Sequence, residues 1–137
     1  MADPKVAYSF QARFMPAIVA RTKQSTLRNF RKSITPVVAG QTIQLYFGMR
    51  TKFCRKLGTA TVLAIEPVTI DLVYSAVYPQ ALLERCKGKS RFAAIDGFNN
   101  WNDLVGWFIT NHPGKTLWEG NRIFWGDTFV PASAQGV

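Results

Sequence analysis

The amino-acid sequence predicts a single α+β domain with a small, curved or barrel-like β-sheet and a few short helices. Its 137 residues fit one domain with one core. A hydrophobic share of 47% and a charged share of 18% are typical of a folded globular chain. Several short segments with the composition of strands are interspersed with two or three short segments of helical spacing, which favours the α+β class.

The first half of the chain is predicted to begin with a strand over residues 6–10 and a short helix over residues 14–21. Pro16 is compatible with this helix because proline is tolerated in a first helical turn. A basic segment and a turn follow. Over residues 41–47 apolar side chains alternate with Gln44 and Tyr46, a period of two that predicts a half-buried strand.

The middle of the chain continues with GMRTKFCRKLG, residues 48–58, which we expect to form a basic loop or hairpin. Residues 59–65 and 68–73 are rich in β-branched side chains and are separated by Pro67, so they predict two strands or one broken strand. Residues 82–92 have an ambiguous pattern.

The clearest helix lies late in the chain. Asn100 can cap it, Asp103 occupies the third helical position, and Pro113 and Gly114 end it. Residues 122–125 and 129–130 predict the final strands. We therefore expect one domain over residues 1–130 and a flexible tail over residues 131–137.

The basic residues are distributed unevenly. The formal net charge is +9, and no acidic residue occurs between Asp3 and Glu66, a span that holds eleven lysines and arginines. The second half shares the remaining six basic residues with seven acids. Such an excess of positive charge favours a polyanionic partner, and nucleic acid is the commonest polyanion.

Other features restrict the class of protein. Cys54 and Cys86 belong to no CxxC or Cys/His cluster, so we expect two reduced thiols, no metal and no cofactor. The first residues lack the apolar core of a signal peptide, and no run approaches membrane-spanning length. These observations predict a soluble, cytoplasmic protein without a membrane partner.

The segment RTKQSTLR, which begins at Arg21, combines an amine, a hydroxyl and a guanidinium. If a strand begins at Thr26, then Thr26 and Arg28 point from the same face, and Lys23 can fold back over it. Like charges on Arg21, Arg28 and Arg31 would lower the pKa of Lys23, and a lysine so tuned can act as a general base. The alternative is a solvated basic loop that at most contacts phosphates.

The same segment resembles the signature of the ASCH family, Gly-x-Lys-x-x-Thr-x-Arg after a short helix, with Arg21, Lys23, Thr26 and Arg28 at the defined positions. FQARF, GQTIQLYFGMRTKFCRKLG, AIDGF and IFW are also similar to family elements, in the family's order. The resemblance covers about residues 10–125 and implies a PUA-like β-barrel fold.

Two positions differ from the family pattern. Arg21 replaces the usual glycine, and Asp96 stands where the amidohydrolase members carry a glutamate, which is one methylene longer. Those members hydrolyse N4-acylated cytidines. The resemblance implies Lys23 as the base, Thr26 as the nucleophile or water-orienting hydroxyl, and Asp96 as the partner acid. Other ASCH domains are considered RNA-binding modules, and some cleave RNA.

Further candidate contacts come from the basic surface. Tyr46 is expected to point outward near basic residues, which suits a flipped or single-stranded base. The candidate nucleic-acid or nucleoside contacts are Arg21, Arg28, Arg31, Tyr46, Arg50, Lys52, Arg55 and Lys56. For the last four the alternative is a solvated hairpin. His112, at the end of the late helix, is expected to have a capping or surface role rather than a catalytic one.

These observations support two main hypotheses. The first is an RNA-preferring nucleic-acid-binding domain with a Lys/Thr/Arg pocket for a base or a modified nucleoside. The second is an amidohydrolase of N4-acylated cytidine-type nucleosides that uses Lys23, Thr26 and Asp96, with Tyr46 at the pocket edge. A ribonuclease and a phage-encoded interaction protein are further alternatives.

Overall fold

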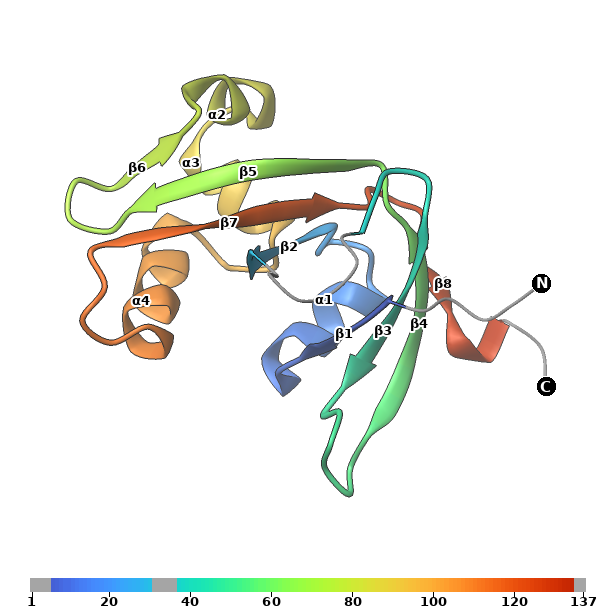
Figure 1. The fold of residues 1–137 in the computed structure, drawn as a ribbon. Coiled ribbons are helices and arrows are strands. Elements are labelled where there is room, and N and C mark those ends of the chain that lie inside the picture. The colour runs from blue at the N-terminus through green and yellow to red at the C-terminus, as the bar shows by residue number, and fades with distance from the viewer. Residues whose placement is uncertain (1–5, 31–36, 135–137) are drawn as a thin grey trace.

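The computed structural model describes residues 6–30 and 37–134, whose strands form two sheets (Figure 1). The strands are β1 (Val6–Phe10), β2 (Ser25–Asn29), β3 (Thr42–Phe47), β4 (Arg55–Thr61), β5 (Ala64–Asp71), β6 (Ala76–Tyr78), β7 (Leu117–Phe124) and β8 (Val130–Pro131). The helices are α1 (Met15–Val19), α2 (Gln80–Cys86), α3 (Lys89–Ile95) and α4 (Trp101–Asn111), with 3₁₀ turns η1 (Ala12–Phe14) and η2 (Ala132–Ala134).

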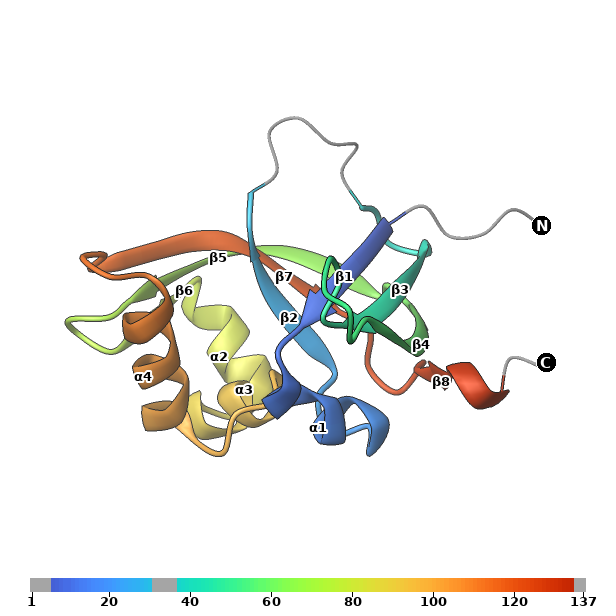
Figure 2. The same cartoon turned by 90° about the horizontal axis from the view of Figure 1, so that it is seen from below.

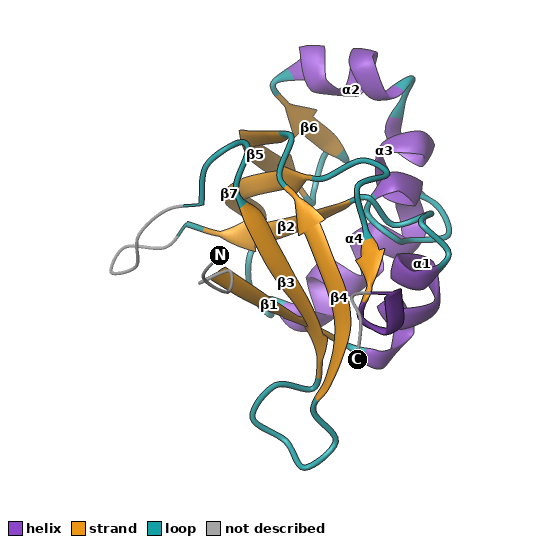
Figure 3. Cartoon of the chain, turned by 90° about the vertical axis from the view of Figure 1, so that its right-hand side faces the viewer, coloured by secondary structure: helices purple, strands orange, loops and turns teal. Residues whose placement is uncertain are grey.

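The first sheet has the strand order β1-β3-β4-β8 (Figure 3). β1 runs parallel to β3, with Phe10 opposite Phe47, so both strands end at the same edge of the sheet. β3 and β4 are antiparallel, and their register shifts between Leu45 and Tyr46, as in a β-bulge. The loop that joins them projects beyond the body of the sheet (Figure 1).

The second sheet has the order β2-β7-β5-β6, and all its described pairs are antiparallel. β7 lies between β2 and β5, with Phe124 opposite both Ser25 and Ala64. The predicted α+β class is confirmed. A closed barrel is not confirmed, because the strands of the described residues pair in two separate four-stranded sheets.

The helices α2, α3 and α4 lie on one side of the second sheet (Figure 2). Their apolar faces enter the core: Leu82 in α2, Phe92 in α3, and Leu104 and Phe108 in α4 are almost fully buried. Trp118 of β7 packs edge-on against Phe108, with ring centroids 5.1 Å apart. This packing holds α4 against β7.

Most predicted elements are confirmed. The strands predicted over residues 6–10 and 41–47 are β1 and β3, and Asn100 caps α4 by accepting a 2.9 Å hydrogen bond from the backbone N–H of Asp103. The ambiguous residues 82–92 belong to α2 and α3. Lys87 and Gly88, with φ of 67° and 109°, separate these two helices.

The separation predicted at Pro67 is wrong, because β5 continues through Pro67 and the break between the two strands lies at residues 62–63. At Pro67 the strand pairs only with β7, since β6 ends at Tyr78 opposite Thr69, so the missing N–H removes no bond to β6. In the predicted tail, Pro131 still pairs with Gly58 of β4, and residues 135–137 lie outside the described part. The helices of the described residues are too short and too polar to cross a membrane.

Candidate functional site

The segment that begins at Arg21 forms a tight connection between α1 and β2. The backbone N–H groups of Arg21 and Lys23 donate to the carbonyls of Ile18 and Ala17, each at 3.0 Å. Arg21 has a φ of 68°, the left-handed conformation that glycine adopts without strain. The glycine of the ASCH pattern would therefore suit this position better than arginine does.

The side chain of Arg21 points toward the segment before β8. Its guanidinium donates to the carbonyl of Phe129 and, at 3.3 Å, to that of Asp127. It also lies 5.8 Å from the centroid of the Phe129 ring. Arg21 therefore faces the segment before β8 and does not line the cavity described next.

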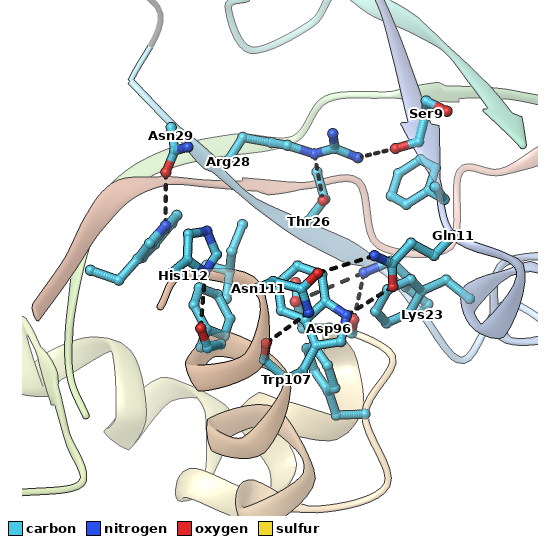
Figure 4. A pocket seen from close by; sticks show the side chains of 16 residues that line it. Ser9, Gln11, Lys23, Thr26, Arg28, Asn29, Asp96, Trp107, Asn111 and His112 are labelled. Carbon is cyan, nitrogen blue, oxygen red and sulfur yellow. Dashed lines mark hydrogen bonds and ion pairs between the residues drawn. The ribbon is translucent and has the colours of Figure 1, made fainter. Parts of the chain in front are cut away.

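A cavity of about 350 Å³ lies between β1, β2, β7 and α4 (Figure 4). Thr26 and Arg28 point from the same face of β2, and the Arg28 Nε donates to the Thr26 Oγ1 at 3.0 Å. Lys23 extends into the cavity from the turn before β2, and Asp96 enters it from the end of α3. The structure thus brings together Lys23, Thr26, Arg28 and Asp96.

Lys23 and Asp96 form a buried pair. The Lys23 Nζ lies 3.8 Å from the Asp96 Oδ2, with side-chain exposures of only 3% and 6%, and it donates to the Asp96 backbone carbonyl. Burial lowers the pKa of Lys23 to about 8 against the opposing effect of the Asp96 carboxylate, and Arg28 and Arg13 lower it further. The expected direction is right, but burial has a larger effect than the neighbouring arginines.

Asp96 is held by a second buried group that the sequence did not reveal. The Ser25 Oγ donates to the Asp96 Oδ1 at 2.8 Å, and Ser25 is fully buried. Burial raises the pKa of Asp96, although Lys23 and this hydrogen bond act in the opposite direction. Despite being one methylene shorter than glutamate, Asp96 reaches the amine of Lys23 at ion-pair distance.

Gly97 makes room for the stem of Lys23. Its φ is 95°, and a Cβ at this position would lie 2.7 Å from the Lys23 Cδ and 3.1 Å from the Phe14 Cδ1. Only glycine tolerates both the backbone conformation and this close approach. The step from Asp96 to Gly97 therefore positions the carboxylate and the lysine together.

Aromatic rings surround the two cations of the site. The Lys23 Nζ lies 4.7 Å from the ring centroid of Phe14, and the Arg28 guanidinium lies 4.8 Å from that of Phe10. The Arg28 guanidinium also donates to the Ser9 carbonyl at 2.8 Å. The remaining aromatic lining consists of Phe98, Trp107, Phe108 and Trp118.

Two exposed amides of the cavity lining meet (Figure 4). The Gln11 Nε2 donates to the Asn111 Oδ1 at 3.3 Å, and the Trp107 Nε1 donates to the Gln11 Oε1 at 3.0 Å. His112 follows α4 as its C-cap, as predicted, and also lines the cavity, where its ring stacks on that of Phe108 at 5.2 Å. The amides and the imidazole add hydrogen-bonding groups to a largely aromatic wall.

The other predicted contacts lie elsewhere. Tyr46 is half-buried, donates from its hydroxyl to the Gln44 Oε1 at 3.0 Å, and is not among the residues that line the cavity. On the β3–β4 loop and the start of β4, Arg50, Lys52 and Arg55 are exposed and Lys56 is half-buried. Arg31 lies outside the described residues.

Sequence reasoning missed Ser25 and the Gln11–Trp107–Asn111 group. Gln11 and Asn111 are 100 positions apart, so no local pattern connects them. One signal was available, because Trp107 and Asn111 are one helical turn apart and share a face of α4. Across the described ranges, 6–30 and 37–134, no three His, Cys, Asp or Glu residues gather in a way that could hold a metal ion.

The fold of this chain is similar to that of solved ASCH domains. Solved structures similar to this chain include that of ASCH from Zymomonas mobilis, with a TM-score of 0.51, 17% identity, and 93% of this chain and 73% of that chain covered. A serine-to-alanine mutant of that protein matches with a TM-score of 0.50, 17% identity, and coverages of 94% and 73%. No protein-family model and no curated protein matches the chain.

Proposed function

We propose that the cavity binds a nucleobase or nucleoside. The observation that supports this most directly is the convergence of Lys23, Thr26, Arg28 and Asp96 in one cavity of about 350 Å³. This volume falls at the small end of ligand pockets, which span roughly 300–1,000 Å³. The cavity therefore suits a ligand of the size of a single nucleoside.

The lining matches the chemistry of a base. A nucleobase has two apolar faces, which stack on aromatic rings, and a polar edge, which needs both donors and acceptors. The cavity provides aromatic rings such as Trp107 and Phe108, the cationic donors Lys23 and Arg28, and a carboxylate acceptor in Asp96. We further propose that RNA is the natural source of the base, since the first half of the chain holds no acid between Asp3 and Glu66.

A second candidate function is hydrolysis of an N4-acylated cytidine-type nucleoside. It is favoured by the buried Lys23–Asp96 pair, because a lysine with a pKa of about 8 is partly unprotonated near neutral pH. The Arg28 Nε already donates to the Thr26 Oγ1. Thr26 can therefore still donate its hydroxyl proton to a base.

In this reaction the unprotonated Lys23 amine takes a proton from Thr26, or from a water that Thr26 orients, and the resulting oxygen attacks the acyl carbon. The amide C–N bond breaks, and the leaving nitrogen of the base takes the proton back from the Lys23 ammonium. Asp96 stabilises that ammonium at 3.8 Å. If Thr26 carries the acyl group, water then releases it as a carboxylic acid.

The test combines ligand binding with turnover. Binding of cytidine and N4-acetylcytidine is measured by calorimetry, and release of cytidine by chromatography, between pH 6 and 9. We expect turnover to rise with pH up to about 8, where the Lys23 amine becomes unprotonated. Lys23→Arg should lower turnover by about 100-fold or more while it keeps most of the binding, because arginine does not lose its proton.

Lys52→Arg is the matched control, since Lys52 is exposed outside the cavity lining. It should leave both measurements unchanged. Absence of binding to either nucleoside by the wild type would overturn the pocket proposal. Binding without turnover would support the binding pocket and contradict the proposed hydrolase activity. Full turnover in Lys23→Arg would contradict the role of Lys23 as the base.

A further inference from the structure

The loop between β3 and β4, residues 48–54, displays an aromatic side chain among cations. Phe53 is 66% exposed, more than any other large apolar side chain of the described residues except Tyr74. Arg50 and Lys52 in the loop and Arg55 at the start of β4 are also exposed, and the Lys52 Nζ lies 5.2 Å from the centroid of the Phe53 ring. An aromatic platform with adjoining cations is the arrangement that binds single strands.

The loop is built to hold this arrangement. The Thr51 Oγ1 donates to the Gly48 carbonyl at 2.6 Å and accepts from the Phe53 backbone N–H at 3.2 Å. The Cys54 N–H donates to the Thr51 carbonyl at 3.2 Å. Because these bonds already order the backbone beside Phe53, a partner that stacks on the ring meets a smaller entropic cost.

Charge distinguishes Phe53 from the other strongly exposed aromatic. Tyr74, in the turn between β5 and β6, is 82% exposed, but its backbone N–H donates to the carboxylate of Asp71 at 2.9 Å. No acidic residue occurs between residues 37 and 65, which include the whole β3–β4 hairpin. The surroundings of Phe53 therefore suit a phosphate-bearing partner and those of Tyr74 do not.

The loop begins beside the cavity. Since β1 and β3 run parallel with Phe10 opposite Phe47, the chain leaves β3 for the loop at the edge where β1 leads into the cavity lining. The Met49 N–H donates to the Ser9 Oγ at 3.1 Å, and the Ser9 carbonyl accepts from Arg28. Ser9 therefore contacts both the loop and the guanidinium that lines the cavity.

We propose that Phe53 is a base-stacking site for single-stranded nucleic acid, with Arg50, Lys52 and Arg55 on the adjoining phosphates. The proposal rests on the proposed function and deepens it, because the nucleoside in the cavity would then be part of a strand whose flanking nucleotide stacks on Phe53. A single strand fits better than a duplex, since the ring needs an unstacked base.

The test is fluorescence anisotropy with labelled oligouridine and oligodeoxythymidine of about 12 nucleotides, a length within the site sizes of single-strand binders. Phe53→Ala should weaken binding by roughly 5- to 100-fold, the range for the loss of one stacked base. Phe53→Trp should retain the affinity, because indole stacks at least as well. Tyr74→Ala, the matched control, removes an even more exposed aromatic side chain and should leave the affinity unchanged.

Equal losses with both oligonucleotides would support stacking without a sugar preference, and a larger loss with oligouridine would support RNA as the partner. The proposal is overturned if Phe53→Ala binds within two-fold of the wild type, or if Tyr74→Ala loses as much. It is also overturned if the wild type binds neither strand at low salt. The proposed function is tested separately, because cytidine binding in the cavity needs no strand.

Discussion

The cavity and the β3–β4 loop use the same kind of residue in opposite ways. Lys23 and Lys52 both belong to the acid-free half of the chain, and their local sequences are similarly basic. Lys23 is buried beside Asp96, which changes its proton affinity, whereas Lys52 is exposed beside Phe53. The comparison indicates that burial, more than the number of nearby cations, lowers the pKa of Lys23 and so allows it to act as a base.

The largest expected effect is the loss of stability when the buried Lys23–Asp96 ion pair is broken, compared with the partly exposed Arg13–Asp103 pair. Asp96→Ala removes the carboxylate that faces Lys23 and accepts from the Ser25 hydroxyl, so a buried cation loses its counter-charge and a buried donor loses its acceptor, although the backbone carbonyl of residue 96 still accepts from Lys23. We expect the free energy of unfolding at pH 7 to fall by about 3–5 kcal/mol, as for other broken buried pairs. Urea denaturation measures this.

The control is Asp103→Ala, which removes the partner of Arg13 at 2.6 Å. This pair is partly exposed, with side-chain exposures of 37% and 24%, so the loss should be about 1 kcal/mol or less. Equal losses in the two variants would contradict the distinction between the cavity and the surface.

The second effect is the pH dependence of stability. Unfolded lysine has a pKa of 10.5, and burial lowers the pKa of Lys23 to about 8, so between these values the unfolded chain binds one more proton than the folded chain. The free energy of unfolding of the wild type, relative to Lys23→Met, should therefore rise from pH 8 to pH 10.5, by roughly 3 kcal/mol in total.

Asp96 should change the stability with pH in the opposite direction to Lys23, and at acidic pH. Because burial raises its pKa, the folded chain keeps a proton that the unfolded chain has lost, so stability falls as pH rises above the ordinary carboxyl value of 3.8. Chemical denaturation at a series of pH values checks both slopes. A flat difference between wild type and Lys23→Met above pH 8 would show that Lys23 keeps its proton.

Much of the fold could be predicted because its signals are local. Alternation identified β3, and a capping residue three positions before an aspartate identified the start of α4. The same holds for Thr26 and Arg28, since a spacing of two places them on one face of a strand. These predictions needed only the chain within a few residues.

The remaining features depend on contacts between distant segments. Ser25 and Asp96 are 71 positions apart, and Gln11 and Asn111 are 100 positions apart. No pattern in the neighbouring sequence predicts either contact. The pairing of strands into two sheets instead of one barrel has the same origin, because it depends on which edges meet. The main cause of the Lys23 shift could not be foreseen either, since burial is a property of the packed molecule.

The smallest expected effect is the difference in stability between two variants, Gly97→Ala and Gly88→Ala, that each add one methyl group. Gly97 and Gly88 both have a positive φ, of 95° and 109°; Gly88 is the N-cap of α3, and Gly97 follows its C-cap Asp96. A Cβ on Gly88 would meet nothing within 4 Å, whereas one on Gly97 would lie 2.7 Å from the Lys23 Cδ. Gly88→Ala should therefore lose only the free energy of the strained backbone, about 1–3 kcal/mol.

Gly97→Ala should lose about 1–2 kcal/mol more, because the stem of Lys23 must move and its amine must leave the position beside Asp96. Thermal and urea unfolding of the two alanine variants measure the difference. The displaced amine should also change the pH dependence, so Gly97→Ala should flatten the rise in stability above pH 8 that Gly88→Ala retains. If the two variants lose the same stability and show the same rise in stability with pH, then Gly97 is needed only for its backbone conformation and does not position Lys23.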